Sequence, residues 1–126
     1  MKKIKKFKFG WLFWGLILET ILHWWLSNNS FLIKNYGISL SWNSQNVVFV
    51  NIIFVLILGW GYIKNFSWGL GLILIGGMVN LIDRLYFGYI RDYWNLGFGV
   101  VNNLNDWIIG IGVLLFLVEL LWKKSK

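Results

Sequence analysis

The chain has 126 residues, of which 58% are hydrophobic and 13% charged, and its formal net charge is +7. A water-soluble domain of this length needs a charged surface, and so few charged residues cannot supply one. The composition therefore excludes an ordinary soluble protein and indicates a protein surrounded by lipid. Cysteine is absent, which excludes disulfides, thiolate chemistry and cysteine-ligated metal sites.

The positive charges gather at the two ends of the chain. Five lysines precede the first apolar stretch and three follow the last one: Lys2, Lys3, Lys5, Lys6, Lys8, Lys123, Lys124 and Lys126. A nucleic-acid-binding protein would instead carry its basic residues on one face or groove. Flanking lysines are typical of membrane orientation, so we expect membrane lipid around the chain and no nucleic-acid partner.

Four apolar stretches approach the length of about 20 residues that a helix needs to cross a bilayer. They lie at roughly residues 9–26, 47–63, 68–85 and 104–122. Because no lipid-facing backbone group can stay unpaired, each stretch should form an α-helix. We expect an all-α membrane protein, a four-transmembrane-helix bundle in which residues 1–126 form a single domain.

The first apolar stretch follows basic residues, as in a secretory signal, but it is long and no small-residue cleavage site follows it. We therefore interpret it as a retained first span. The excess of lysine at cytoplasmic ends places both termini and the link containing Lys64 in the cytoplasm. Two short extracytoplasmic loop regions result, at roughly residues 27–46 and 86–103.

Acidic side chains are few, and inside a membrane each one is costly and a candidate for function. Glu119 lies four residues before Lys123, so we expect a helix-end ion pair. Glu19 and His23 have the same spacing in the first span, which favours a hydrogen bond between neighbouring turns over a proton relay. The five acids are Glu19, Asp83, Asp92, Asp106 and Glu119.

A polar set lies near the outer end of the third span. Asn80, Asp83 and Arg84 are spaced at i, i+3 and i+4, which puts Asn80 on one face of the helix with both charges. Buried groups of this kind need partners on other helices. The set can therefore either hold the bundle together or belong to an active site, and its spacing alone does not separate the two.

Two further aspartates lie near the outer ends of spans. Asp106 can cap the fourth helix, and Asp92 can be a solvated loop carboxylate beside Arg91. Taken together they allow a second interpretation, because two carboxylates that meet at one point share a proton. One can then activate water while the other protonates the leaving group, as in aspartic proteases.

Residues 76–85 read Gly-Gly-Met-Val-Asn-Leu-Ile-Asp-Arg-Leu. This run resembles a signature of the bacterial lipoprotein signal peptidase (signal peptidase II) family. Residues 88–92 resemble its glycine-to-aspartate motif, residues 103–106 its Asn-x-Ala-Asp motif, and residues 35–37 its Asn-x-Gly motif. Glu19 and His23 stand where the family carries Asp and Lys. Asn105 and Trp107 replace small residues beside Asp106.

The resemblance implies a membrane-embedded aspartic endopeptidase that removes signal peptides from diacylglyceryl-modified prolipoproteins. Asp92 and Asp106 would be its catalytic pair. The other implied site residues orient that pair, contact substrate or support the network: Asn35, Gly37, Asn80, Asp83, Arg84, Asn103 and Glu19. The resemblance also implies the bacterial cell (inner) membrane, and we expect a monomer. One histidine and no cysteine disfavour a zinc site, so we expect no metal or other cofactor.

Two alternatives remain open from the sequence. A small ion- or proton-coupled transporter could use Glu19, His23 and Asp83 as an ion path, although it gives no special role to Asp92. A catalytically inactive homologue could act as a membrane binding protein. The peptidase hypothesis requires Asp92 and Asp106 to come together near the outer face of the membrane.

Overall fold

The computed structural model describes residues 2–37 and 44–126. In this part of the chain there are four helices, α1 (Lys2–Asn28), α2 (Ser44–Lys64), α3 (Trp68–Phe87) and α4 (Leu104–Lys124). Each contains a segment long and apolar enough to cross a membrane. The predicted four-span architecture is therefore confirmed. Residues 38–43, which belong to the first predicted loop region, lie outside the described residues.

The two connections that the lysine distribution predicts to be extracytoplasmic contain four short strands, which were not predicted from the sequence. They are β1 (Ile33–Asn35), β2 (Ile90–Asp92), β3 (Trp94–Gly97) and β4 (Val100–Asn102). β1 pairs antiparallel with β2, and β3 with β4. Backbone groups outside a helix need partners, and pairing two connections supplies them. The β1–β2 ladder thereby ties the first outer connection to the second.

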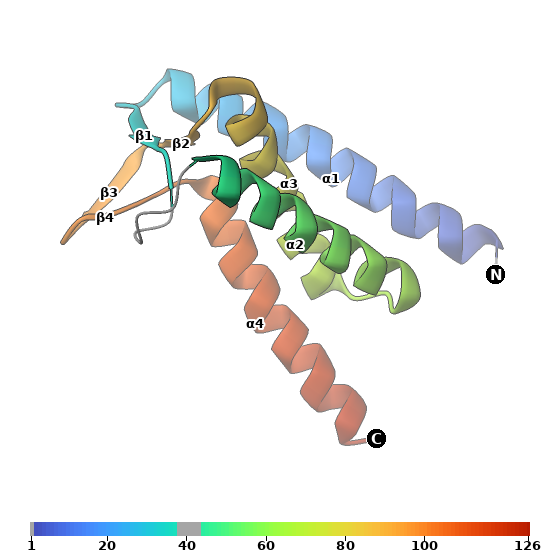
Figure 1. Cartoon of the computed structure of the whole chain (residues 1–126). Coiled ribbons are helices and arrows are strands. Elements are labelled where there is room, and N and C mark those ends of the chain that lie inside the picture. Colours follow the sequence, from blue (N-terminus) through green and yellow to red (C-terminus); the bar gives the residue numbers. More distant parts are fainter. Residues whose placement is uncertain (1, 38–43) are drawn as a thin grey trace.

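The β3–β4 hairpin turns through three consecutive residues with positive φ. These are Gly97 (82°), Phe98 (54°) and Gly99 (74°). Glycine adopts this left-handed region without steric cost, whereas phenylalanine rarely does. The side chain of Phe98 is fully exposed at the tip. The hairpin extends beyond the helix ends, at the left of Figure 1.

Helix α3 is the centre of the bundle. Half of its membrane-crossing segment (50%) is buried inside the protein, against 11% for each of the other three spans. Small residues allow the backbones of α3 and α4 to touch. A Cβ added to Gly69 would lie 2.3 Å from the Phe116 backbone nitrogen, and one added to Gly112 would lie 2.9 Å from the Gly69 carbonyl oxygen. Close approach at glycine is a usual way for membrane helices to associate.

The predicted ion pair between Glu119 and Lys123 is wrong. The Glu119 carboxylate accepts hydrogen bonds from the Ser67 hydroxyl and, at 2.9 Å, from the Trp68 backbone amide, and among the described residues it forms no ion pair with Lys123. Ser67 is the N-cap of α3 and also accepts from the Leu70 amide. The first N–H groups of a helix lack internal partners and carry partial positive charge, so they attract a carboxylate.

The strands and the two chain termini lie at opposite ends of the helices (Figure 1). The end that carries the strands is also where α3 finishes and α4 begins. Gly88 ends α3 with φ of 81°, and Asn103 caps α4. Polar residues from three helices and both of these connections therefore meet at this end, the outer end of the predicted orientation.

Candidate active site

The first turn of α4 fixes Asp106. Asn103 and Asp106 form a reciprocal capping box. The Asp106 amide donates to Asn103 Oδ1 at 3.1 Å, and the Asn103 amide donates to Asp106 Oδ2 at 3.1 Å. Such a box satisfies two of the helix's unpaired donors at once. The helix-capping function considered from the sequence is therefore real, and it fixes the carboxylate in place.

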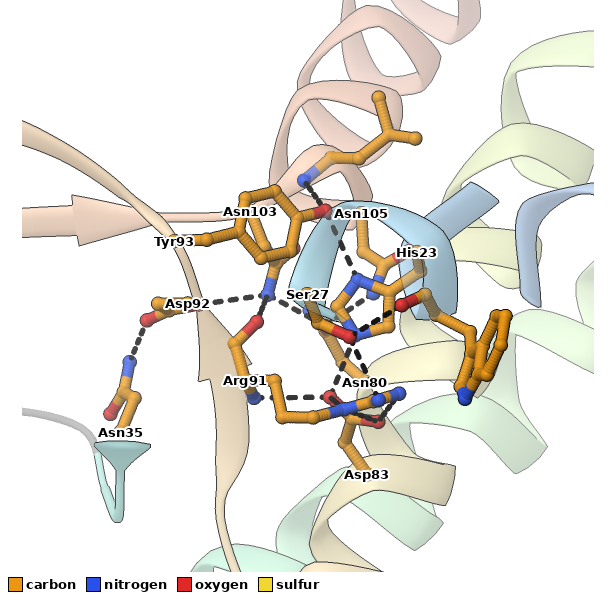
Figure 2. Close-up of polar contacts among 12 residues, drawn as sticks. His23, Ser27, Asn35, Asn80, Asp83, Arg91, Asp92, Tyr93, Asn103 and Asn105 are labelled. Atoms are coloured by element: carbon orange, nitrogen blue, oxygen red, sulfur yellow. Dashed lines mark hydrogen bonds and ion pairs between the residues drawn. The ribbon is translucent and has the colours of Figure 1, made fainter. Parts of the chain in front are cut away.

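The side chain of Asn103 connects this cap to Asp92. Its Nδ2 lies 2.8 Å from Asp92 Oδ1 and 3.2 Å from Asn80 Oδ1, and the residue is completely buried. One asparagine thus contacts both aspartates. Its amide group donates to Asp92 (Figure 2), and its backbone amide donates to Asp106. The structure brings together the two carboxylates that the sequence analysis paired.

Asp92 is positioned by the ladder between β1 and β2. Ile33 lies opposite Asp92, and Asn35 lies opposite Ile90. Asn35 Nδ2 donates to Asp92 Oδ2 at 2.9 Å, while Asn35 Oδ1 accepts from the Gly37 amide at 3.2 Å. The contact between Asn35 Oδ1 and the Gly37 amide closes an Asx turn, which orients the Asn35 side chain so that its NH₂ group faces the Asp92 carboxylate. The role of Gly37 here is to hold Asn35.

Asp92 is not the solvated loop carboxylate considered as one alternative, because its side chain is completely buried. Burial raises the pKa of the Asp92 carboxyl above its ordinary value, and the nearby charge of Asp106 acts in the same direction. The hydrogen bonds from Asn35 and Asn103 oppose this rise only in part. A carboxyl in such a position keeps its proton to higher pH than a solvated aspartate does.

Asp106 receives a second hydrogen bond from α3. Asn80 Nδ2 lies 3.3 Å from Asp106 Oδ1. Asn80 Oδ1 in turn accepts from Asn103 and, at 2.8 Å, from Asn105 Nδ2. The asparagine at position 105, where the family motif has alanine, is therefore part of the network. Asn80, the N-cap Asn103 and Asn105 thus form one connected set of amide groups, in which Asn80 and Asn103 contact the carboxylates.

A groove of about 640 Å³ opens beside Asp106. Most of it is apolar, and it follows α4 toward the middle of the span. Its lining residues are Leu96, Asn102, Asp106, Trp107, Gly110, Ile111, Val113 and Leu114. A carboxylate at the polar end of an apolar groove is a suitable arrangement for a substrate that is itself embedded in lipid.

Asp83 belongs to a second polar cluster. Its carboxylate forms a salt bridge with Arg91, at 2.9 Å from Nη2, and lies 2.7 Å from His23 Nε2. The backbone amide of Arg91 also donates to it at 3.0 Å. Arg91 Nη1 reaches Ser27 at 2.9 Å. The cluster joins α1, α3 and β2 on the face of β2 opposite to Asp92 (Figure 2).

The predicted hydrogen bond between Glu19 and His23 is wrong. Within the described part of the chain, the two ring nitrogens of His23 contact Asp83 and the Tyr93 hydroxyl, and Glu19 Oε1 is buried with no hydrogen-bond partner. The ring faces the bundle interior, where a carboxylate from α3 competes successfully with one from its own helix. Glu19 is 3% exposed, and among the described residues it forms no hydrogen bond with His23.

Arg84 lies on the side of the aspartate pair. It is 7% exposed, and its guanidinium interacts electrostatically with both Asp92 and Asp106. Its Nε is buried and has no hydrogen-bond partner among the described residues. Adjacent residues on α3 thus belong to different clusters. Asp83 forms a salt bridge with Arg91, whereas the charge of Arg84 interacts with Asp92 and Asp106. The sequence analysis expected all three polar residues of α3 at one network.

Three residues near the aspartates were not predicted from the sequence as site residues: Arg91, Tyr93 and Asn105. One signal was present for Arg91, because residues in an extended segment alternate between faces. Arg91 and Asp92 therefore had to point in opposite directions if the segment were a strand. No local sequence pattern indicates a site role for Tyr93 or Asn105, because their partners lie on other elements and depend on how those elements pack.

Several known proteins are similar to this chain in sequence. A family model described as Signal peptidase (SPase) II matches residues 7–122. The chain is similar to a lipoprotein signal peptidase of Campylobacter jejuni, at 27% identity over 97% of this chain and 95% of the relative. A lipoprotein signal peptidase of Streptococcus thermophilus is 33% identical over 74% of this chain and 67% of the relative.

The fold has a counterpart among solved structures. One described as a bacterial membrane enzyme superposes with a TM-score of 0.76 and 20% sequence identity. The superposition covers 92% of this chain and 90% of the other. The overall fold of this chain is therefore one that an experimentally determined membrane enzyme also adopts.

Proposed function

The chain belongs to the signal peptidase II family, and from this premise we propose that it is an aspartic endopeptidase that removes signal peptides from lipid-modified prolipoproteins. The observation that carries the proposal is the sharing of Asn103 by two carboxylates. Its side chain binds Asp92 at 2.8 Å and its backbone amide binds Asp106 at 3.1 Å. Two close carboxylates cannot both ionise cheaply, so the pair holds one proton.

The chemistry follows from that shared proton. The ionised carboxylate takes a proton from a water molecule, whose oxygen attacks the carbonyl carbon of the scissile peptide bond. The protonated carboxyl then gives its proton to the leaving amine nitrogen. The two aspartates titrate as a unit, and acid and base are roles of the pair. Arg84, charged and close to both, stabilises the negative charge that develops during the attack.

The remaining predicted residues have supporting roles in this proposal. Asn35 and Asn103 orient Asp92, Asn80 and Asn103 orient Asp106, and Gly37 holds Asn35. Asp83 anchors β2 through Arg91. Because Asp92 is completely buried while Asp106 lines the groove, the substrate approaches along α4 and reaches Asp92 after local displacement of the outer connections.

The location is part of the same proposal. The protein is placed in the bacterial cytoplasmic membrane as a monomer, with the aspartate pair at the outer face, where a lipidated precursor presents its cleavage site. The transporter alternative is less well supported. It required Asp83 and His23 to serve an ion path, whereas Asp83 is paired with Arg91 and His23 is held between Asp83 and Tyr93.

Cleavage of a prolipoprotein tests the proposal. Purified protein in detergent is given a diacylglyceryl-modified precursor and, in parallel, the unmodified precursor. We expect wild type to cut only the modified form. Asp92→Asn and Asp106→Asn should each lower kcat by roughly 10⁴-fold, the scale seen when one member of a catalytic unit is removed. Both variants should keep the thermal stability of wild type to within a few degrees.

Glu119→Gln is the matched control, since it changes an acid to its amide at the opposite end of the bundle and should leave cleavage unchanged. Normal cleavage by either aspartate variant would refute the pair. Failure of wild type on the modified precursor of its own bacterium would favour the inactive homologue.

A further inference from the structure

A chain of hydrogen bonds connects α3, α1 and the start of α4 beside the aspartate pair. His23 Nε2 lies 2.7 Å from Asp83 Oδ2, and His23 Nδ1 lies 3.1 Å from the Tyr93 hydroxyl. The backbone amide of Leu104 donates to the same hydroxyl at 3.0 Å. Both side chains are buried, with His23 0% and Tyr93 6% exposed. Figure 2 shows the tyrosine between the histidine ring and the first turn of α4.

The positions of the protons follow from the groups at the two ends. Asp83 accepts from the guanidinium and the backbone amide of Arg91, so it is an ionised acceptor and His23 Nε2 is the donor. The other ring nitrogen, Nδ1, is then the acceptor that faces the Tyr93 hydroxyl. Tyr93 donates its hydroxyl hydrogen there, and its oxygen accepts the Leu104 N–H. Burial raises the pKa of Tyr93 to about 12, which keeps this hydroxyl protonated.

This chain joins the two segments that carry the aspartates. Tyr93 follows Asp92 directly, and Leu104 is the first residue of α4, two positions before Asp106. A hydrogen bond between Tyr93 and Leu104 therefore limits how far the strand and the helix can separate. His23 determines which way the tyrosine hydroxyl points, because it offers the only acceptor placed for that hydrogen among the described contacts of Tyr93.

We propose that His23 and Tyr93 are positioning residues for the cleavage reaction: held by Asp83, they fix the first turn of α4 against β2 and so set the separation of Asp106 and Asp92. The inference rests on the proposed function, because it assigns a role in that reaction. The inference assigns a role to His23 of the first span, which contacts Asp83 but neither Asp92 nor Asp106.

The kinetic test uses Tyr93→Phe, His23→Leu and the double variant. Misplacement of reacting groups by about 1 Å can cost 100-fold in rate, so each single variant should lower kcat by roughly 100-fold with little change in KM. The double variant should be no slower than the worse single variant, because both act through one chain. Tyr86→Phe is the matched control, since Tyr86 is 81% exposed, and it should cleave like wild type.

A second readout does not depend on cleavage. Amide hydrogen exchange at Leu104 should be slow in wild type and faster in Tyr93→Phe and in His23→Leu, while amides in the middle of α3 keep their protection. Unchanged kcat and unchanged exchange at Leu104 in both variants would overturn the inference. Loss of protection throughout the bundle would overturn it too, because the residues would then be structural only. If wild type does not cleave, the proposed function fails while the exchange experiment still tests the coupling.

Discussion

At the scale of single residues, the site is built from amide groups around two carboxylates. Asn35, Asn80 and Asn103 each donate to Asp92, to Asp106 or to both. Amides carry no charge, so they orient the carboxylates without neutralising them, as a lysine or arginine in direct contact would. In the proposed mechanism the pair thereby keeps its shared proton. The guanidinium of Arg84 interacts with both carboxylates through its charge and has no hydrogen bond to either of them among the described residues.

The hydrogen bond from Asn35 to Asp92 leads to a prediction about pH. Burial raises the pKa of Asp92, and this bond lowers it in part by stabilising the ionised form. Cleavage needs one proton on the pair, so activity should fall as pH rises above the raised pKa. Asn35→Ala should raise that pKa further and move the alkaline limb of the kcat profile to higher pH.

The measurement is the pH dependence of kcat with the lipidated precursor. Asn95→Ala serves as control, because Asn95 is exposed on β3 and contacts the Gly97 amide instead of an aspartate. Its profile should superpose on that of wild type. A shift of the Asn35→Ala limb to lower pH would contradict the sign derived from the hydrogen bond.

At the scale of elements, the short strands and the tight helix contacts hold the aspartates at one place. The β1–β2 ladder places Asp92 opposite Ile33 and next to Asn35. Contact of the α3 and α4 backbones brings Asn80 within reach of the first turn of α4. An aspartate on a flexible loop would lack this order, and ordered groups are what an acid–base pair requires.

The contact between α3 and α4 is tested by alanine at glycine. A methyl group at Gly112 would lie 2.9 Å from two backbone atoms of α3, so Gly112→Ala forces the helices apart. We expect a loss of about 1–3 kcal/mol in the free energy of unfolding. Gly110→Ala, two residues away on the same helix, meets nothing within 4 Å and should stabilise α4 by roughly 0.5–1 kcal/mol.

Thermal unfolding in detergent, followed by circular dichroism, measures the difference. The melting temperature of Gly112→Ala should fall well below that of wild type, and that of Gly110→Ala should equal or exceed it. Equal melting temperatures for the two variants would show that the helices do not touch at Gly112.

At the scale of the whole molecule, four spans place both termini at one end and the polar clusters at the other (Figure 1). Large apolar side chains cover much of the outside, among them Trp14, which is 68% exposed, and Leu114, which is 67% exposed. Such a surface is stable in lipid and unstable in water. Polar groups of the outer end therefore lie where the lipid gives way to water, which is where a peptidase for lipid-anchored substrates needs them.

Orientation across the membrane can be measured with single cysteines, because the chain has none of its own. The flanking lysines predict that the termini are cytoplasmic and the hairpin outside. A membrane-impermeant maleimide should label Asn95→Cys in intact cells. Ser125→Cys, at the end of α4, should be labelled only after lysis. The reverse pattern would show that the protein is inserted in the opposite orientation.

The sequence by itself determined the spans and their number, and it also led to the proposal that Asp92 and Asp106 form the catalytic pair, because each of these depends on local properties. Hydrophobic length decides whether a segment crosses lipid, and the motifs around Asp92 and Asp106 are contiguous in the chain. The expected helix-end pair of Glu119 with Lys123 and the hydrogen bond of Glu19 with His23 were also local inferences. Both were wrong, because partners on other helices were better placed.

Tertiary structure alone decided which polar groups meet. Pairing of β1 with β2 brings Asn35 to Asp92 across 57 positions of the chain, and packing of α1 on α3 brings His23 to Asp83 across 60. Burial makes these contacts necessary, since a buried polar group without a partner is costly. The sequence shows which polar residues need hydrogen-bond partners, and only the packing of the helices and strands determines which residues those partners are.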